Sequence, residues 1–384
     1  MPSDDLPQDL CLRERSVSEG WRVELIDPSA GHDEPLSWCT VVDLKQRIGS
    51  AVVSVGGIGG VGTRAEHRRK GHSRRVMIGA LQLMQKKRFG LSVLHGIQDF
   101  YHRFGYTTCM AEHRFALQTA TLLTHLPPAQ RDARSLRTRQ LRKQDLPTIA
   151  RLHNRENAER TGSIVRKSKF SGFQKGTWWT IRTDAQIVED RSGRVIGYVV
   201  VDRADEHCRV SEIGGEGQQT WDALLRFVAH RAKRGGHAEI SVYAPGDHPF
   251  AVYCRRFGLV QQSVYPRNER PMGRIIDLER CITSMLPELE HRWETCDQDQ
   301  TLHLQTEIGR VTLHWRAGRL VLIDSSGKAD VRLGQADLAL LLFGYARPED
   351  LITTGQARMT RRVQPLMKRL FPLQDAHMWW TDRF

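Results

Sequence analysis

The stretch from residue 61 to residue 105 constrains this chain most, because it joins a strand, a cationic turn with glycine and a helix in that order. An apolar, alternating segment ends at Val61-Gly62-Thr63, and the basic residues of positions 64–73 follow directly. The apolar positions of residues 76–84 then recur at helical spacing. The first N–H groups of a helix have no partner inside the helix, and they attract anions. We therefore interpret this stretch as the phosphate-binding site of a nucleotide cofactor.

A second glycine pattern overlaps the end of the same strand. Residues 57–62 read Gly-Ile-Gly-Gly-Val-Gly, which is the G-x-G-x-x-G of dinucleotide-binding folds. That interpretation requires a helix to begin at the last glycine and an acidic residue about 20 positions further on. Here the expected helix begins nearly ten residues later, and Gln82 stands in place of the acid. The pattern is more typical of a strand whose glycines let another chain or a ligand approach closely.

The charge of the chain is concentrated on this turn. The formal net charge is +13, and such a balance alone indicates only non-specific attraction to nucleic acid. The segment from Arg64 to Arg88 contains nine lysines and arginines but only one acidic residue, Glu66. The strongest local excess of positive charge thus coincides with the predicted phosphate site. Nucleic-acid binding through this cluster remains the alternative.

The composition is that of a soluble globular protein, with 40% hydrophobic and 26% charged residues. A length of 384 residues predicts two or three domains. No apolar run is long enough for a membrane span, and the first residues do not resemble a signal peptide, so we expect a cytoplasmic protein. Seven scattered cysteines without a C-x-x-C pair predict reduced thiols and no metal site.

The order of expected elements repeats along the chain. Residues up to about Glu19 show little pattern and are expected to hold little structure, whereas three strands, at 21–26, 36–42 and 51–58, lead into the turn. A strand at 91–95 and the cluster at 100–106 follow the first helix. The cluster Phe-Tyr-His-Arg-Phe-Gly-Tyr is echoed at 250–259, about 150 residues later and again after strand, helix and strand. This echo indicates an internal duplication.

The second copy lacks the cationic turn. Residues 212–219, at the corresponding place, contain no lysine or arginine. We therefore expect only the first copy to bind a phosphate-bearing cofactor. Near the start of the second unit, Asp145 and Pro147 predict a helix start.

A third unit begins near Pro287 and ends in an aromatic terminus. Three of the last six residues are aromatic, and the final one is Phe384. Exposed chain ends seldom carry so many aromatic side chains. We expect the terminus to be buried against another part of the protein.

The turn and the aromatic cluster resemble a known cofactor site. Arg68-x-x-Gly71-x-Ser73 matches the [Q/R]-x-x-G-x-[G/A] pyrophosphate turn of the GNAT acetyltransferases, with serine at the last position. Alone, this short pattern also fits a solvated basic helix start. With Phe100-Tyr101-x-x-Phe104-Gly105-Tyr106 about 27 residues later, the combination favours acetyl-CoA. A tyrosine near the cofactor sulfur can protonate a departing thiolate, although such a side chain is also common in cores.

The chain as a whole resembles the enhanced-intracellular-survival (Eis) family of GNAT acetyltransferases. The resemblance extends from about Trp21 to the end and is strongest at residues 61–75, 95–106 and 336–344. It implies an α+β protein with tandem GNAT folds, whose mixed central sheets are flanked by helices, and a C-terminal α/β domain similar to sterol carrier protein 2. The expected divisions are a catalytic GNAT domain at 1–128, a degenerate one at 129–286 and a sterol-carrier-like domain at 287–384.

The resemblance also implies a site and a mechanism. The expected cofactor-binding residues are Val61, Gly62 and Thr63, which match the strand that pairs with pantetheine, and Arg68, Arg69, Lys70, Gly71, His72 and Ser73, which match the pyrophosphate turn. Tyr101 matches the general acid, and the terminal carboxylate of Phe384 matches the general base. The implied reaction is direct acetyl transfer from acetyl-CoA to a primary amine, without a metal.

The partners follow from the same resemblance. They are an amine acceptor, such as an aminoglycoside, a polyamine or a lysine side chain, and further copies of the chain in a hexamer. Two helices that wall the acceptor pocket in the family have no counterpart before Trp21, so no acceptor-binding residue is assigned. A different class of function, a non-catalytic regulator that binds acyl-CoA or lipid, remains the alternative.

Overall fold

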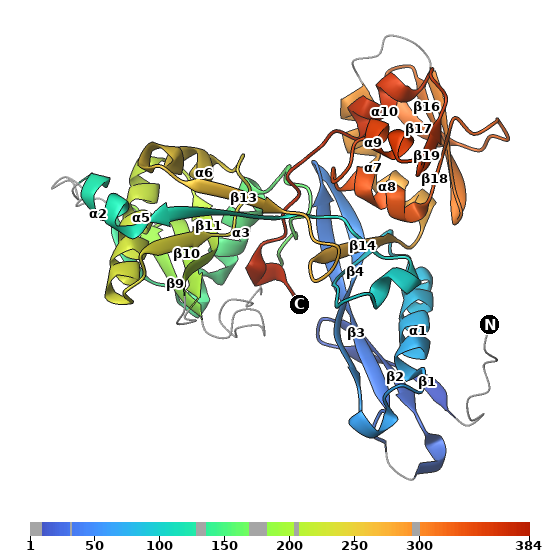
Figure 1. The fold of residues 1–384 in the computed structure, drawn as a ribbon, viewed down its shortest axis with the longest axis horizontal. Helices are drawn as coiled ribbons and strands as arrows, with labels where there is room; N and C mark the ends of the chain where they lie inside the picture. The colour runs from blue at the N-terminus through green and yellow to red at the C-terminus, as the bar shows by residue number, and fades with distance from the viewer. Residues whose placement is uncertain (1–9, 31–32, 128–135, 169–182, 203–206, 294–299) are drawn as a thin grey trace.

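Three β-sheets with helices packed against them make up the chain (Figure 1). The computed structural model describes residues 10–30, 33–127, 136–168, 183–202, 207–293 and 300–384. In Figure 1 the first sheet lies at the lower right, the second at the left and the third at the upper right, and the C-terminus lies between the first two. The architecture is the mixed α+β class that the sequence predicted.

The first sheet has the strand order β1-β2-β3-β4-β5-β14-β6. Its strands are β1 Cys11–Val17, β2 Gly20–Ile26, β3 Ser37–Ile48, β4 Ala51–Thr63, β5 Leu91–His95, β6 Thr107–Thr108 and β14 Pro271–Ile275. The parallel strands β4 and β5 are joined by α1 His72–Lys86. The expectation of little structure before Glu19 was wrong, because β1 pairs with β2 along its full length. As an edge strand with mostly exposed side chains, β1 has no apolar pattern to reveal it.

The second sheet has the order β13-β7-β12-β11-β10-β9-β8. Its strands are β7 Glu112–Gln118, β8 Arg137–Gln140, β9 Thr183–Glu189, β10 Val195–Asp202, β11 Cys208–Gly215, β12 Glu239–Val242 and β13 Val260–Val264. Its helices are α2 Thr119–His125, α3 Leu146–Glu156, α5 Gln218–Arg234 and α6 Pro249–Cys254.

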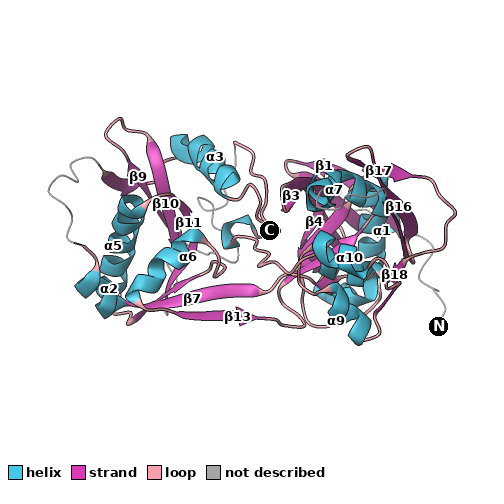
Figure 2. Ribbon diagram, turned by 90° about the horizontal axis from the view of Figure 1, so that it is seen from above, coloured by secondary structure: helices cyan, strands magenta, loops and turns pink. Residues whose placement is uncertain are grey.

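The first two sheets exchange a strand with each other. Strand β7 directly follows the strands of the first sheet in the sequence, yet it lies between β12 and β13 of the second. Strand β14 follows the second sheet and is inserted between β5 and β6 of the first. Figure 2 shows β7 and β13 running side by side. Sheet membership therefore crosses residue 128, where the sequence suggested a boundary, and the division by residue number stays a prediction.

The duplication is visible in the strand order. In each of the two sheets a parallel pair joined by a helix, β4-α1-β5 or β11-α5-β12, follows an antiparallel neighbour, β3 or β10. The turns differ in length. Eight residues, 64–71, separate β4 from α1, but only two, 216–217, separate β11 from α5. The second copy therefore lacks the loop, as well as the cations, of the predicted phosphate site.

The third sheet, of order β17-β16-β15-β18-β19, packs with its helices onto the first. Its strands are β15 Gln300–Thr306, β16 Gly309–Arg316, β17 Arg319–Ile323, β18 Val331–Leu333 and β19 Ala357–Met359. The helices are α7 Leu278–Trp293, α8 Gln335–Leu342, α9 Pro348–Thr353 and α10 Gln364–Leu370. One apolar core joins Val53 and Leu91 of the first sheet to α7 and the third sheet. Since α7 continues through residue 286, the third unit has no sharp start at that point.

Several sequence-based expectations concern chemistry rather than fold. No helix among the described residues is long and apolar enough to cross a membrane. Six of the seven cysteines carry free thiols, and Cys296 lies outside the described residues. Within the described ranges, no group of three or more potential ligand side chains is arranged to hold a metal ion.

Candidate active site

An opening between β4 and β5 lies at the centre of the candidate site. The two strands pair from Val55–Leu91 to Ile58–Leu94, after which β4 continues to Thr63 along β3 alone. A bulge in β4, where Gly60 and Val61 lie opposite the single residue Cys39 of β3, accompanies this separation. Among the described residues, the edge of β4 that faces away from β3 therefore has no strand partner at Val61, Gly62 and Thr63. This is the arrangement expected for a strand that pairs with pantetheine.

The cationic turn lies at the far end of this edge. Gly71 caps α1 with φ 79°, and Arg69 also has a positive φ, 64°. Only glycine adopts such a conformation without steric cost, which explains Gly71 in the motif. Lys70 and both arginines at 68 and 69 are exposed, and Arg68 Nε donates to the Thr63 carbonyl across 3.4 Å.

The first turn of α1 completes the anion site. The N–H groups of His72 and Ser73 precede the first N–H groups that are bonded within the helix, those of Arg74 and Arg75, which both donate to the carbonyl of Gly71. The His72 side chain is buried, and its pKa is lowered by that burial and by the charges of His67 and Lys70. His72 is therefore neutral at pH 7 and adds no charge to the exposed cations of the turn.

Tyr101 begins the short 3-10 turn Tyr101–Phe104, which follows β5 in the sequence. Its ring packs against Phe100 and Tyr106, with centroids 4.9 and 6.2 Å away. Burial raises the pKa of its hydroxyl to about 12, with a smaller contribution from Cys39. The phenol is therefore protonated at neutral pH, as a proton donor must be. Tyr101 also belongs to the apolar core of the first sheet, so the two interpretations of this side chain are compatible.

The C-terminal residue lies on the glycines of β4. A Cβ at Gly57 would stand 2.5 Å from the Phe384 ring, and one at Gly59 would stand 3.4 Å from the terminal carboxyl carbon. The ring also meets His95 edge-on, with centroids 6.0 Å apart. The G-x-G-x-x-G residues therefore lie within a strand, and two of its glycines make room for the chain's own end. No dinucleotide turn exists here, because α1 begins ten residues after Gly62.

The aromatic terminus is buried, as its composition predicted. Trp379 and Trp380 are 1% and 9% exposed. The indole of Trp379 donates to Asn157 across 3.0 Å, and Arg383 pairs with Glu112. We call residues 372–384 the tail.

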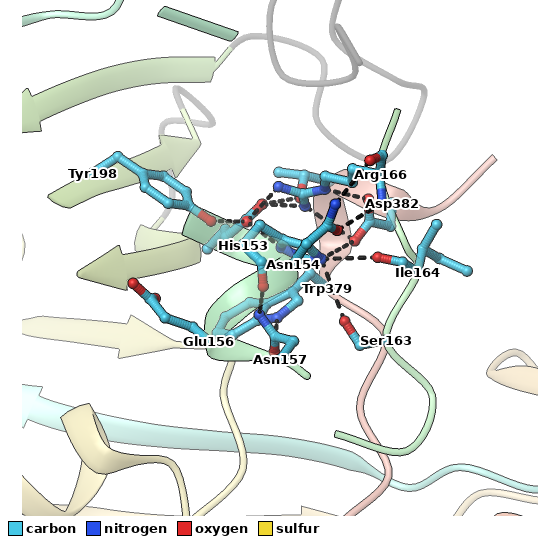
Figure 3. A network of polar contacts seen from close by, with 12 residues as sticks. His153, Asn154, Glu156, Asn157, Ser163, Ile164, Arg166, Tyr198, Trp379 and Asp382 are labelled. Carbon is cyan, nitrogen blue, oxygen red and sulfur yellow. Dashed lines mark hydrogen bonds and ion pairs between the residues drawn. The ribbon is translucent and has the colours of Figure 1, made fainter. Parts of the chain in front are cut away.

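A polar cluster that no sequence pattern predicted holds the tail (Figure 3). The buried Arg166 binds both Glu212 of β11 and Asp382 of the tail. These residues lie 46 and 216 positions from Arg166 in the sequence. No local pattern links positions so far apart, so nothing in the sequence signals this contact.

His95, the last residue of β5, contacts the ring of Phe384. Its pKa is held well below the ordinary range by burial and then by the charges of Arg383 and Arg270. The imidazole is therefore neutral at physiological pH. His95 thus adds no charge beside the terminal residue.

A model of the acetyltransferase (GNAT) domain family matches residues 31–109, which include β4, the turn, α1, β5 and Tyr101. No curated protein matches the chain. GNAT domains use acetyl-CoA as their cosubstrate, which supports an acyltransferase.

Solved structures resemble almost the entire chain. A GCN5-related N-acetyltransferase from Anabaena variabilis has a TM-score of 0.72 and 16% identity, with coverage of 94% of this chain and 89% of that one. One from Kribbella flavida has a TM-score of 0.69 and 20% identity, with 94% and 87% covered. Eis1 from Mycobacterium abscessus has a TM-score of 0.67 and 13% identity, with 99% and 94% covered. Residues 31–109 therefore match the GNAT acetyltransferase domain family, and the chain shares its overall fold with these three proteins.

Proposed function

We propose that this chain is an N-acetyltransferase that moves the acetyl group of acetyl-CoA directly to a primary amine. One observation carries the proposal: the terminal residue Phe384 lies on Gly57 and Gly59, where β4 and β5 separate. A carboxylate at this point, with Tyr101 on the segment that follows β5, supplies a base and an acid to one opening.

The cofactor is proposed to lie along the free edge of β4. Its pantetheine amides would pair with the backbone of residues 61–63, and its pyrophosphate would rest on residues 68–73. The exposed cations of the turn and the N–H groups of α1 support this placement. The thioester then lies toward Gly59 and Tyr101.

Transfer exchanges the C–S bond of the thioester for a C–N bond. The carboxylate of Phe384 accepts a proton from the acceptor ammonium, and the neutral amine attacks the thioester carbonyl. The tetrahedral adduct then expels the thiolate, which takes the proton of Tyr101, and the nitrogen loses its second proton, which restores the phenol of Tyr101. A tyrosine with a pKa of about 12 keeps this proton until the thiolate needs it.

The proposed acceptor is a small amine, such as an aminoglycoside or a polyamine, or a lysine side chain. The charges around the terminus do not favour a polycation, because Arg383 and Arg270 both lie against Glu112. The hexamer, the cytoplasmic location and the sterol-carrier-like character of the third unit are further parts of the proposal that follow from the Eis resemblance.

A thiol-release assay with acetyl-CoA and a panel of amines tests this function. We expect CoA to be released at a rate that depends on the amine supplied. Tight binding of acetyl-CoA without CoA release from any amine would favour the alternative, a regulator that binds acyl-CoA or lipid. Acetyl-CoA should also displace nucleic acid from the Arg64–Arg88 cluster, and a failure to compete would contradict the cofactor placement.

A further inference from the structure

The guanidinium of Arg166 connects the second sheet to the tail, entirely out of solvent (Figure 3). Its Nε and Nη2 donate to the two carboxylate oxygens of Asp382 at 2.7 and 3.0 Å. Its Nη1 and Nη2 donate to the two oxygens of Glu212, both at 2.7 Å. Both carboxylates are bound by two hydrogen bonds each, which fixes direction as well as distance.

Other groups hold this ion cluster from every side. The hydroxyl of Tyr198 donates to Glu212 across 2.5 Å, and Thr381 also donates to Glu212. His153 lies 3.1 Å from the same carboxylate. Asn154 binds both the N–H and the carbonyl of Arg166, so the backbone of Arg166 is fixed too. The cluster therefore leaves Asp382 little freedom to move.

The tail contacts corresponding positions in the two duplicated sheets. Leu94 is the last residue of β5 that pairs with β4, and Val242 is the last residue of β12 that pairs with β11, so His95 corresponds to Tyr243. Phe384 packs on His95, and Trp380 packs on Tyr243 with centroids 4.7 Å apart. The strand pair β4-β5 borders the candidate site in the first sheet. The tail packs against the corresponding pair, β11-β12, in the second sheet.

The second copy has lost the features needed for transfer. Its turn is two residues long, and by the shared Arg-Phe-Gly sequence Cys254 stands where the first copy has Tyr101. Burial raises the pKa of the Cys254 thiol well above its usual value, so it remains protonated and unreactive. What remains in this copy is a rigid surface that binds residues 379–382.

We propose that Arg166 and Asp382 are positioning residues for the terminal carboxylate, and that the second GNAT copy serves as the dock that aims it. This inference rests on the proposed function, in which that carboxylate is the base. A single residue, Arg383, separates Asp382 from Phe384, and Arg383 is itself paired with Glu112. Two residues span at most about 7 Å, so a displacement of Asp382 reaches the carboxylate almost undiminished.

Full-length variants test the proposal by kinetics. Asp382→Asn keeps the shape of the side chain but removes the charge that faces Arg166. We expect kcat at pH 7 to fall about tenfold to a hundredfold, because small misplacements of a catalytic group have effects of this size. The KM for acetyl-CoA should change less than about twofold, since the cofactor turn is untouched.

The pH profile separates positioning from general damage. Near the amine's own pKa, about 10 for a lysine-like amine, the acceptor no longer needs a base. The defect of Asp382→Asn should therefore shrink as pH rises. A wild-type kcat, or a defect of the same size at every pH, would overturn the proposal.

Two further variants keep the test decisive. Thr381→Val removes only one hydroxyl from the cluster and should give a smaller defect with the same pH trend; it serves if Asp382→Asn does not fold. Asp222→Asn alters a buried carboxylate of the same copy that binds Tyr253 and should leave kcat unchanged.

Wild-type protein and a variant with one residue added after Phe384 are measured in parallel. No CoA release by the wild type with any amine contradicts the proposed function itself. A second outcome is that the wild type is active, the extension abolishes activity, and Asp382→Asn has the activity of the wild type. In that case the proposed function stands and only the positioning role is wrong.

Discussion

The ring of Phe384, the last residue, lies on Gly57 in the middle of β4 so closely that a methyl group there would stand 2.5 Å from the ring. Gly57→Ala should therefore displace the terminus. We expect kcat to fall at least about tenfold and stability to drop by about 1–3 kcal/mol through overpacking. Steady-state kinetics and urea unfolding measure both effects.

Gly59→Ala provides a graded comparison, because its nearest contacts with Phe384 are 3.3 and 3.4 Å. Its effect on kcat should be smaller than that of Gly57→Ala. Val52→Ala, on the exposed face of the same strand, is the control. If Gly57→Ala, Gly59→Ala and Val52→Ala lowered kcat equally, the cause would be a general disturbance of β4 and not a displaced terminus.

Tyr101→Phe should reduce kcat by about a hundredfold or more while the dissociation constant for acetyl-CoA stays the same, since general acid catalysis is worth this much. Because the pKa of Tyr101 is raised to about 12, the wild type should show no loss of kcat from tyrosine ionisation between pH 7 and pH 10. A fall in kcat with an apparent pKa near 9 or 10 would argue against Tyr101 as the acid. Rate profiles at saturating substrates give the answer.

Arg68→Ala should weaken acetyl-CoA binding about tenfold with little change in kcat, because one charge-assisted contact to the pyrophosphate is lost. Isothermal titration measures the affinity directly. Lys86→Ala is the matched control, since Lys86 is also exposed, lies at the opposite end of α1 and pairs with Glu14. Similar losses in both variants would point to the overall charge of the cluster instead of the turn.

Glu156 makes stability depend on pH. Burial raises its pKa to about 7, although hydrogen bonds from the Gly215 N–H oppose the shift. The pKa of Glu156 is 4.5 in the unfolded chain and about 7 in the folded protein. The folded state therefore loses stability relative to the unfolded chain as the pH rises from about 4.5 through 7, because ionisation of the buried carboxyl is costly. Glu156→Gln should therefore stabilise the protein at pH 8, by about 1 kcal/mol or more, and have little effect at pH 4.5.

Thermal unfolding of Glu156→Gln at the two pH values checks this sign. The exposed Glu159, three residues further on, gives the control Glu159→Gln, which should alter stability at neither pH. Greater stabilisation of Glu156→Gln at pH 4.5 than at pH 8 would contradict the assignment.

Local signals predicted the parts of the fold that depend on neighbouring residues. Strand β5 begins and ends where the sequence indicated, and α3 begins directly after Asp145, with Pro147 in its first turn. The turn at Gly71 followed from a motif whose glycine has a steric reason. The motif thereby located the turn next to Thr63, where β4 continues beyond its pairing with β5.

Long-range pairing was not predictable in the same way. The exchange of β7 and β14 depends on partners about 150 residues away, and neither strand differs locally from one that stays in its own sheet. The contact of Arg166 with Asp382 has the same origin. The terminal residue was linked to the site only through the family resemblance, since composition indicated burial but not where.

In the proposed reaction the carboxylate of Phe384 acts as the base, and extension of the chain by one residue is the most direct test of this role. An added residue leaves every side chain in place but moves the charge away from Gly59. We predict that CoA release at pH 7 falls at least about a hundredfold, with acetyl-CoA affinity unchanged. An extended protein that releases CoA at the wild-type rate would contradict the account.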